Sequence, residues 1–317
     1  MGTVTHVRTD FGGGSVQSVV LGLALRNSAR RLIDLWSLAP GLPWPYWLVD
    51  HAGRLQRKVP GTTFEEVRLG SCRLKVVRAP ASRAQRHVLH FHGGAFVIGG
   101  WHLHGSMLSR VAQASEATVT AVEYRKLPRH GIADATADGL AAYRHLLAEG
   151  VAAQDVVFAG DSAGGWLAFT VADAALAEGL PLPAGIAAIS PLLDLDFDRT
   201  PVGRRRRGCT LFGPRALPAF AGVVLSRGGP GRTPVECDLS SLPPVLLQVS
   251  SSESLYKQVC HMHDLLEAAG ASVELQVWDG QVHVFQAATL LPEAHQAIEQ
   301  VGSFVRRAVD VRERISA

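Results

Sequence analysis

A G-x-S-x-G motif, Gly160-Asp-Ser-Ala-Gly164, lies directly between a strand-like apolar run at residues 156–159 and a helical pattern. A turn this tight from strand to helix holds its central residue in a strained backbone conformation and exposes the side chain at the end of the strand. The N-terminus of the following helix presents unpaired N–H groups that stabilise a negatively charged oxygen. The motif therefore predicts that Ser162 is a nucleophile in acyl transfer. The alternative is a glycine-rich turn without a chemical role.

A second glycine motif, His92-Gly-Gly-Ala-Phe96, follows the apolar run at residues 88–91. Two adjacent glycines leave backbone N–H groups unshielded on a loop, and the tetrahedral intermediate of acyl transfer needs two or three such donors. We expect the N–H groups of Gly93, Gly94 and Ala163 to form the oxyanion hole. Taken alone, the tripeptide is equally consistent with a simple strand-ending turn.

A serine hydroxyl needs a general base, and the base needs an orienting acid. Elbows of the G-x-S-x-G type are typical of α/β hydrolases, in which the acid and then the histidine follow the serine along the chain. Of the downstream histidines, His261, His263 and His295 fall inside helical patterns, whereas His283 lies in a loop just after the apolar run at residues 273–278. We therefore assign His283 as the base.

The orienting acid is expected in the loop after the preceding apolar run, which ends at residue 249. Glu253 is the only carboxylate in that loop, since Asp264 and Glu267 lie a helical turn or more beyond it and Asp238 precedes the run. Glu253 is therefore the predicted acid. The alternative is a first-turn glutamate that only stabilises the dipole of the next helix.

From about residue 65 onward, short apolar runs alternate with helical patterns. The expected strands are residues 67–69, 72–77, 87–91, 117–124, 156–159, 186–189, 245–249 and 273–278. The expected helices are residues 103–114, 135–149, 163–178, 255–269 and 293–309. Strands separated by helices of this length predict crossover units and a mainly parallel sheet.

Two segments fall outside this alternation. Residues 1–60 are predicted to be helices broken at the proline-rich piece 40–45, and residues 196–240 form an insertion rich in Arg, Gly and Pro. We expect both to build one discontinuous cap over the carboxyl edge of the sheet, with residues 61–195 and 241–317 as the catalytic core. A run of four arginines at positions 204–207 belongs to the insertion.

Composition narrows the partners and the compartment. With 317 residues, of which 47% are apolar, the chain can bury a large core, and a net charge of +3 is too small for a nucleic-acid-binding stripe. Its four cysteines lie far apart without CxxC spacing, which predicts neither a disulfide framework nor a zinc site and fits a cytoplasmic location. No apolar stretch reaches the ~20 residues that span a bilayer.

As a set, these motifs resemble the bacterial hormone-sensitive-lipase-like carboxylesterases, in the branch with a GDSAG elbow. Glu123-Tyr-Arg and Leu242-Pro-Pro-Val add to the likeness, which runs from about residue 65 to the C-terminus. The resemblance implies the α/β-hydrolase fold: a mostly parallel, eight-stranded sheet flanked by helices, with a helical cap. The chain departs from the family pattern at Trp166, where Asn is usual, and at Glu253, where Asp is commoner.

The predicted function is hydrolysis of short to medium acyl esters through an acyl-Ser162 intermediate, without a metal or an organic cofactor. Because the base must be neutral, activity should rise as the pH increases. Four aromatic residues are candidates for the wall of the substrate pocket, namely Phe96, Trp101, Tyr124 and Trp166.

Two other functions stay open. One is a lipase or lysophospholipase that acts at an interface through the apolar stretch 16–25 and the arginines 204–207. The other is a non-catalytic receptor for a small ligand, like the plant gibberellin receptors, which resemble these esterases but lack the histidine. The presence of His283 favours the enzyme. The expected partner is a small ester, with no nucleic acid and at most a transient contact with a membrane surface, and a homodimer is left open.

Overall fold

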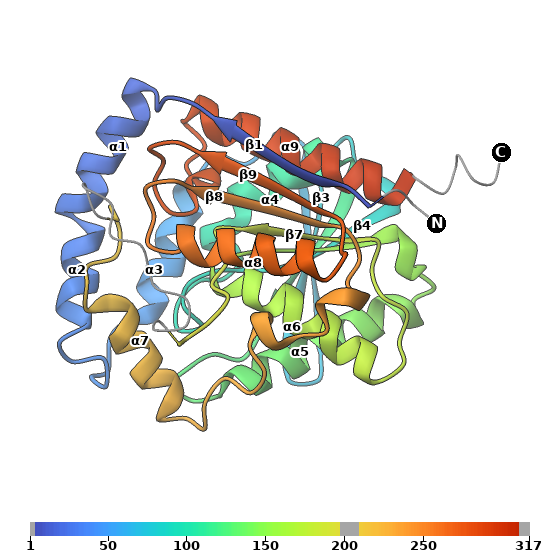
Figure 1. Cartoon of the computed structure of the whole chain (residues 1–317), viewed down its shortest axis with the longest axis horizontal. Coiled ribbons are helices and arrows are strands. Elements are labelled where there is room, and N and C mark those ends of the chain that lie inside the picture. The colour runs from blue at the N-terminus through green and yellow to red at the C-terminus, as the bar shows by residue number, and fades with distance from the viewer. Residues whose placement is uncertain (1–3, 197–208, 311–317) are drawn as a thin grey trace.

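Eight strand-length apolar runs pair into one sheet, and a ninth strand extends it at one edge (Figure 1). The computed structural model describes residues 4–196 and 209–310. The sheet has the order β1-β9-β8-β7-β6-β4-β5-β3-β2. The strands are β1 (His6–Phe11), β2 (Thr63–Leu69), β3 (Cys72–Arg78), β4 (Arg83–Phe91), β5 (Ala117–Glu123), β6 (Val156–Asp161), β7 (Gly185–Ile189), β8 (Val245–Ser250) and β9 (Val273–Trp278). All eight strands predicted from the sequence are confirmed.

The sheet is parallel except at one edge, where β3 pairs antiparallel with both β2 and β5. Phe91 at the end of β4 is in register with Gly160 of β6, and Ser250 of β8 is in register with Trp278 of β9. Because parallel strands end at the same edge of a sheet, the loops that follow these four strands gather at its carboxyl edge.

The N-terminal segment differs from the prediction. The sequence predicts helices throughout residues 1–60 and a sheet of eight strands, but His6–Phe11 forms β1, a ninth strand that pairs parallel with β9. Five of its six side chains are exposed, so no alternation of apolar and polar residues marks it as a strand. The backbone ladder to β9 and the stacking of Phe11 on Trp278, with ring centroids 3.9 Å apart, hold it instead.

Helices cover both faces of the sheet, and the five predicted ones are confirmed. Helices α4 (Trp101–Ser115) and α9 (Pro292–Asp310) pack on one face, and α5 (Ile132–Ala148), α6 (Ala163–Ala177) and α8 (Tyr256–Ala268) on the other (Figure 1). Each layer encloses its own apolar core against the strands. Helix α6 is buried along almost its whole length, which fixes the residue before it, Ser162, in place.

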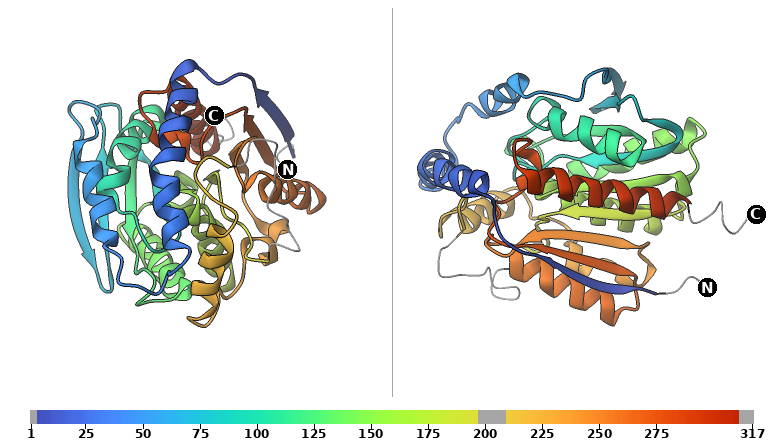
Figure 2. Two further views of the ribbon diagram at one scale, coloured as in Figure 1. Left: turned by 90° about the vertical axis from the view of Figure 1, so that its left-hand side faces the viewer. Right: turned by 90° about the horizontal axis from the view of Figure 1, so that it is seen from above.

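Four further helices lie together at the carboxyl end of the strands (Figures 1 and 2). They are α1 (Val16–Asn27), α2 (Ala29–Trp36), α3 (Tyr46–Ala52) and α7 (Ala216–Leu225). The Arg30 guanidinium on α2 donates to the Cys209 carbonyl at 2.7 Å, which ties the N-terminal helices to the segment leading into α7. The arginines 204–207 lie outside the described residues. Within the described ranges, no helix is both long and apolar enough to cross a membrane.

Candidate active site

Ser162 lies at the turn between β6 and α6 in a backbone conformation that is rare for a residue with a side chain. Its φ is +53° and its ψ is −116°, and its N–H donates to the Ile189 carbonyl at 2.8 Å. The turn closes because its glycines have no Cβ: a Cβ at Gly164 would lie 1.9 Å from the Phe91 carbonyl oxygen, and one at Gly160 would lie 2.1 Å from the Gly164 carbonyl oxygen. Backbone strain of this kind is maintained only where the surrounding packing enforces it.

The glycine loop, residues 92–96, is strained as well. Gly94 has a φ of +114°, and Ala95 and Phe96 have φ values of +54° and +56°. A Cβ at Gly94 would lie 2.4 Å from the Ile98 carbonyl oxygen, and one at Gly93 would lie 2.2 Å from Asp161 Oδ2. Since β4 and β6 are neighbours, this loop lies directly beside the Ser162 turn.

His283 and Glu253, the predicted base and acid, are in direct contact. His283 Nδ1 is hydrogen-bonded to Glu253 Oε2, and both side chains are almost fully buried. The other carboxylate oxygen, Oε1, accepts from the Ser250 N–H at 2.6 Å and from the Ser190 hydroxyl at 2.8 Å. A carboxylate held by three donors has a fixed orientation, and it sets which ring nitrogen of the histidine carries the proton.

Ser190 joins the parts of this site and was not identified by sequence reasoning. It is fully buried at the end of β7 with a φ of +44°, and its hydroxyl donates to Glu253 and accepts from the Val284 N–H at 3.4 Å. Ile189, directly before it, accepts from the Ser162 N–H. The dipeptide Ile189-Ser190 therefore contacts the Ser162 turn, Glu253 and the loop that carries His283. The one sequence signal that could have identified Ser190 is its position directly after the predicted strand 186–189.

Beneath the elbow lies a buried ion pair between Asp161 and His104. His104 Nε2 is 3.2 Å from Asp161 Oδ2, and its Nδ1 is 3.0 Å from the Gly100 carbonyl oxygen. Both partners are acceptors only, so both ring nitrogens donate and the imidazole is charged. Burial alone would lower the pKa of His104, but the Asp161 carboxylate outweighs it and raises that pKa.

The charge of Asp161 is stabilised in the same way. Burial favours its neutral form, but His104, together with the Gly93 N–H, keeps the pKa of Asp161 below its usual value. The carboxylate of Asp161, the residue before the nucleophile, thus connects helix α4 with the glycine loop. The G-x-S-x-G motif contains Asp161, but the pattern alone gave no reason to assign it this role.

Two further histidines near this pair are uncharged. Burial lowers the pKa of His90 to about 4, and burial together with the Lys126 ammonium lowers the pKa of His92 far below its usual value. His92 stacks on Tyr124 with ring centroids 4.3 Å apart, and the Tyr124 hydroxyl donates to the His92 carbonyl at 2.7 Å. These contacts support the glycine loop from behind.

The four predicted pocket residues occupy different places. Phe96 stacks on Phe220 of α7, and Trp166 lies edge-on to Phe96 and is fully buried. Tyr124 is buried behind the glycine loop. Trp101 is not brought to the site, since it packs against Phe64 of β2 and the ammonium groups of two lysines, Lys58 and Lys75.

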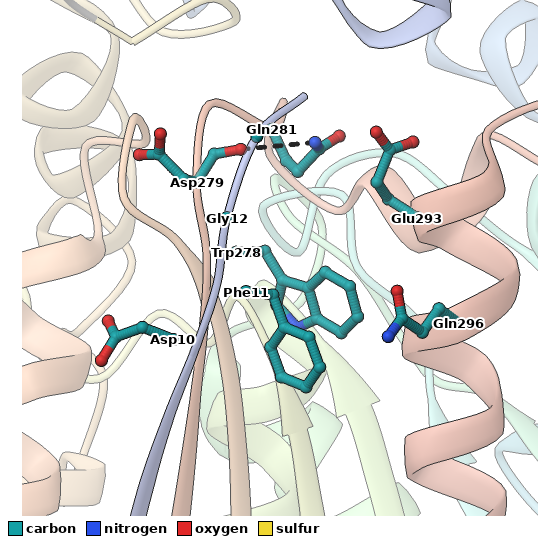
Figure 3. Close-up of a pocket in the computed structure, with 9 residues that line it drawn as sticks. Asp10, Phe11, Gly12, Trp278, Asp279, Gln281, Glu293 and Gln296 are labelled. Atoms are coloured by element: carbon teal, nitrogen blue, oxygen red, sulfur yellow. Dashed lines mark hydrogen bonds between the residues drawn. The ribbon is translucent and has the colours of Figure 1, made fainter. Parts of the chain in front are cut away.

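A cavity of about 330 Å³ lies beside the site, at the ends of β1 and β9 (Figure 3). Phe11, Trp278, Asp279, Gln281 and Glu293 contribute to its lining, and none of the predicted catalytic residues does. Gln281 also links the site to the cap, because its side-chain oxygen accepts from the buried Ser18 of α1 and its carbonyl accepts from the Ser250 hydroxyl.

The donors in the site do not form a metal-binding set. In the described part of the chain, the one group of side chains spaced for a metal ion is His263, Asp264 and Glu267 on the outer surface of α8.

This arrangement is that of an α/β hydrolase: the serine lies at a strained strand-to-helix turn, the glycine loop follows the neighbouring strand, and the His–Glu pair comes from the loops after β8 and β9. The chain belongs to this family, because a family model described as alpha/beta hydrolase fold matches residues 88–287. The predicted fold class is confirmed.

The relatives are esterases. The chain is 37% identical over 314 residues to the carboxylesterase/phospholipase LipF of Mycobacterium tuberculosis, across 93% of this chain and 83% of LipF. It is 35% identical over 295 residues to the esterase LipU of the same organism, across 89% and 99% of the two chains.

Solved structures of esterases have the same fold. The crystal structure of EstE5 soaked in ethyl alcohol superposes with a TM-score of 0.83 at 30% identity, and the match covers 93% of this chain and 99% of that one. An esterase from the bacterial hormone-sensitive lipase family superposes with a TM-score of 0.74 at 28% identity, covering 90% and 98%. The predicted resemblance to hormone-sensitive-lipase-like carboxylesterases is confirmed.

Proposed function

We propose that the chain is a carboxylic ester hydrolase that cleaves short to medium acyl esters through an acyl-Ser162 intermediate. The observation that carries the proposal is the buried hydrogen bond between His283 and Glu253, at the same sheet edge as the strained Ser162. A non-catalytic receptor of this fold has no need of that pair. The similarity to LipF and LipU supports the same class of reaction.

In the proposed mechanism, His283 Nε2 takes the hydroxyl proton of Ser162 as the oxygen attacks the ester carbonyl carbon. The tetrahedral intermediate collapses, its bond to the alkoxy oxygen breaks, and the imidazolium returns the proton to the departing alcohol. His283 then removes a proton from water as the water oxygen attacks the acyl carbon; the bond to Ser162 Oγ breaks, the imidazolium returns the proton to Oγ, and the carboxylic acid is released. Glu253 stabilises the imidazolium in both halves of the cycle.

The oxyanion is stabilised by backbone N–H groups of Gly93, Gly94 and Ala163. The N–H of Gly93 also acts on the Asp161 carboxylate, so we expect Gly94 and Ala163 to supply most of the stabilisation. Loss of one oxyanion donor in comparable sites costs roughly 10²–10³ in kcat.

The domain organisation follows from the same site. We propose residues 61–195 and 241–317 as the catalytic core and residues 1–60 with 196–240, apart from β1, as the cap; residues 1–3, 197–208 and 311–317 lie outside the described residues. The contact between Phe96 and Phe220 supports this division, because it joins the glycine loop to cap helix α7 beside the elbow. We assign Phe96 and Trp166 to the inner end of the acyl pocket and leave Trp101 and Tyr124 out of it.

A series of p-nitrophenyl esters of increasing acyl length, assayed beside a triglyceride emulsion, tests the proposal. We expect the highest kcat/KM on short to medium chains and little release from the emulsion. His283→Gln and Glu253→Gln variants that fold normally should lose most of this activity, since each removes one half of the buried pair. Full activity in either variant contradicts the mechanism.

A further inference from the structure

The outer face of cap helix α1 is apolar, and none of the described residues covers it. Val16, Val19, Val20 and Leu23 are between 57% and 78% exposed, and their spacing of three and four residues places them on one side of the helix. The other side packs on the fold, since buried Ser18 contacts Gln281 while Leu21 and Leu25, both partly buried, pack against the cluster of Trp278 and Phe285. Helix α1 is thus apolar on both sides.

The neighbouring cap segments also carry exposed apolar side chains. Exposed leucines continue along α2 and the following loop, and Trp47 and Leu48 of α3 are 65% and 56% exposed. Figure 2 shows α1, α2, α3 and α7 side by side across the end of the molecule. We call this face the cap surface, and its members are Val16, Val19, Val20, Leu23, Leu32, Leu35, Leu38, Leu42, Trp47 and Leu48.

The exposed charges around the cap surface are mostly positive, although Glu293 of α9 accepts from Ser15 at the N-terminus of α1. Arg31, Arg54 and Arg57 are exposed. The only carboxylates between residues 16 and 60 are Asp34 and Asp50, and both have partners inside the fold: Asp34 pairs with Arg30, and Asp50 accepts from the Leu103 N–H. The described part of the insertion adds Arg215, directly before α7, Arg227, just after it, and Arg232, which pairs with Asp173; it has no carboxylate before Glu236.

We propose that the cap surface docks onto an anionic lipid surface. Exposed aliphatic side chains with a tryptophan and interspersed arginines match the two parts of such a surface, the acyl chains and the negative headgroups. A second copy of the chain fits less well, because a symmetric pairing would bring two arginine-rich faces together. The proposal deepens the proposed function, on which it rests: it makes short to medium acyl esters held at an anionic lipid surface, rather than in a neutral triglyceride emulsion, a substrate class of this enzyme.

The fold also gives the docked molecule a useful orientation. The cap surface lies at the carboxyl end of the strands, where Ser162, Glu253 and His283 are placed (Figure 1). Helix α1 is connected to the loop of His283 through Ser18 and Gln281. A molecule resting on its cap would therefore turn the active site toward the lipid rather than away from it.

Co-sedimentation of the full chain with vesicles tests this. We expect binding to vesicles of phosphatidylglycerol and phosphatidylcholine at low salt, with at least a tenfold lower partition coefficient on pure phosphatidylcholine. Half-molar salt should weaken the binding, since it shortens the screening length to a few ångströms.

Matched variants assign the binding to the cap surface. Val19→Ser/Val20→Ser should lower the partition coefficient roughly tenfold, from the lost burial of two side chains in the acyl region. Val4→Ser/Val7→Ser alters two valines of similar exposure at the far end of β1 and should leave it unchanged. Arg31→Gln/Arg57→Gln should lower it about fivefold for each arginine, whereas Arg78→Gln/Arg144→Gln, on other elements, should have little effect.

The outcomes separate this proposal from the esterase proposal. Ser162→Ala should bind vesicles like the parent chain, and Val19→Ser/Val20→Ser should hydrolyse soluble p-nitrophenyl acetate at the parent rate. No vesicle binding, equal binding to both lipid compositions, or equal effects of the cap and control variants overturns the lipid proposal and leaves the esterase standing. A stable dimer in sedimentation velocity that Val19→Ser/Val20→Ser abolishes also overturns it, since the surface then belongs to a second copy.

Discussion

Among single residues, Ser190 shows how the site is held in register. Its hydroxyl connects the Glu253 carboxylate to the backbone next to His283, and the preceding carbonyl receives the Ser162 N–H. None of the proposed chemical steps uses this hydroxyl. Its effect must therefore act through the geometry and charge of Glu253 and His283.

Ser190→Ala should lower kcat about tenfold to a hundredfold with little change in KM, because a misplaced base affects the transition state more than substrate binding. It should also shift the pH at which kcat/KM reaches half its plateau, since the carboxylate loses one of its donors. Steady-state kinetics across pH 5–9 measure both effects.

Ser115→Ala is the matched control for this change. Ser115 is also fully buried, but its hydroxyl donates within α4 to the Val111 carbonyl, and none of its contacts involves the site. Both variants should lose a similar amount of stability. If they also show the same kinetics and pH profile, Ser190 has only a structural role.

At the residue scale, the sequence pointed to Glu253 and His283 because chemistry and local turn geometry coincide there. Glu253 and His283 each stand in a short loop after an apolar run, and the structure brings them into contact. Ser190 and His104 were missed because their roles come from contacts across the sheet: Ser190 meets Glu253, 63 positions away, and His104 meets Asp161, 57 positions away. No local pattern encodes such pairs.

Among the elements, the turn between β6 and α6 depends on its glycines. Gly164→Ala should destabilise the protein by several kcal/mol or prevent soluble expression, because its Cβ would overlap the Phe91 carbonyl and that backbone cannot move away. Gly222→Ala on α7 is the control, as a Cβ there meets nothing within 4 Å. It should leave stability unchanged or raise it slightly, by up to about 1 kcal/mol. Urea unfolding measures both.

The buried pair of His104 and Asp161 predicts a pH-dependent contribution to stability. Because the pKa of His104 is higher in the folded protein, its protonation stabilises the fold. This stabilisation is complete below the pKa of the unfolded chain, about 6.5, and is lost as the pH rises through the pKa of His104 in the folded protein. The ionised Asp161 carboxylate stabilises the fold in the same way. Its contribution is present above pH 4, about the pKa of an unfolded aspartate, and is lost as the pH falls through the pKa of Asp161 in the folded protein. The pair is therefore strongest near pH 5 to 6.

His104→Gln should consequently lower the free energy of unfolding by about 1–3 kcal/mol near pH 5.5, the range found for charged buried hydrogen bonds. The difference from the parent chain should shrink as the pH rises above 7. Urea unfolding of both proteins at pH 5.5 and pH 9 measures it, and a difference that grows with pH contradicts a charged His104.

For the whole molecule, β1 completes the sheet beside the active site. Phe11 covers Trp278 at the end of β9, five residues before His283. Phe11→Ala should cost about 2 kcal/mol, less than a fully buried phenylalanine because its ring is partly exposed. Val7→Ala, on the same strand, should cost less than half of that. Equal costs in urea unfolding show that the Phe11–Trp278 stacking does not hold the strand.

Strand β1 also marks the limit of sequence reasoning about the fold. The runs that became β6 and β8 are buried at every position and are mostly apolar, so their place inside a parallel sheet was predictable. His6–Phe11 is exposed and polar, and only its pairing with β9, far along the chain, makes it a strand. The same distance in sequence hid the packing of α1 against the loop of His283.

The central claim is that Ser162 is a nucleophile activated by His283, and covalent labelling tests it most directly. A fluorophosphonate probe should react with the full chain and, after digestion and mass spectrometry, be found on Ser162. Ser162→Ala should not react, and His283→Ala should react at least a hundredfold more slowly. No adduct on Ser162 in the folded protein, or labelling that is unaffected by His283→Ala, contradicts the account.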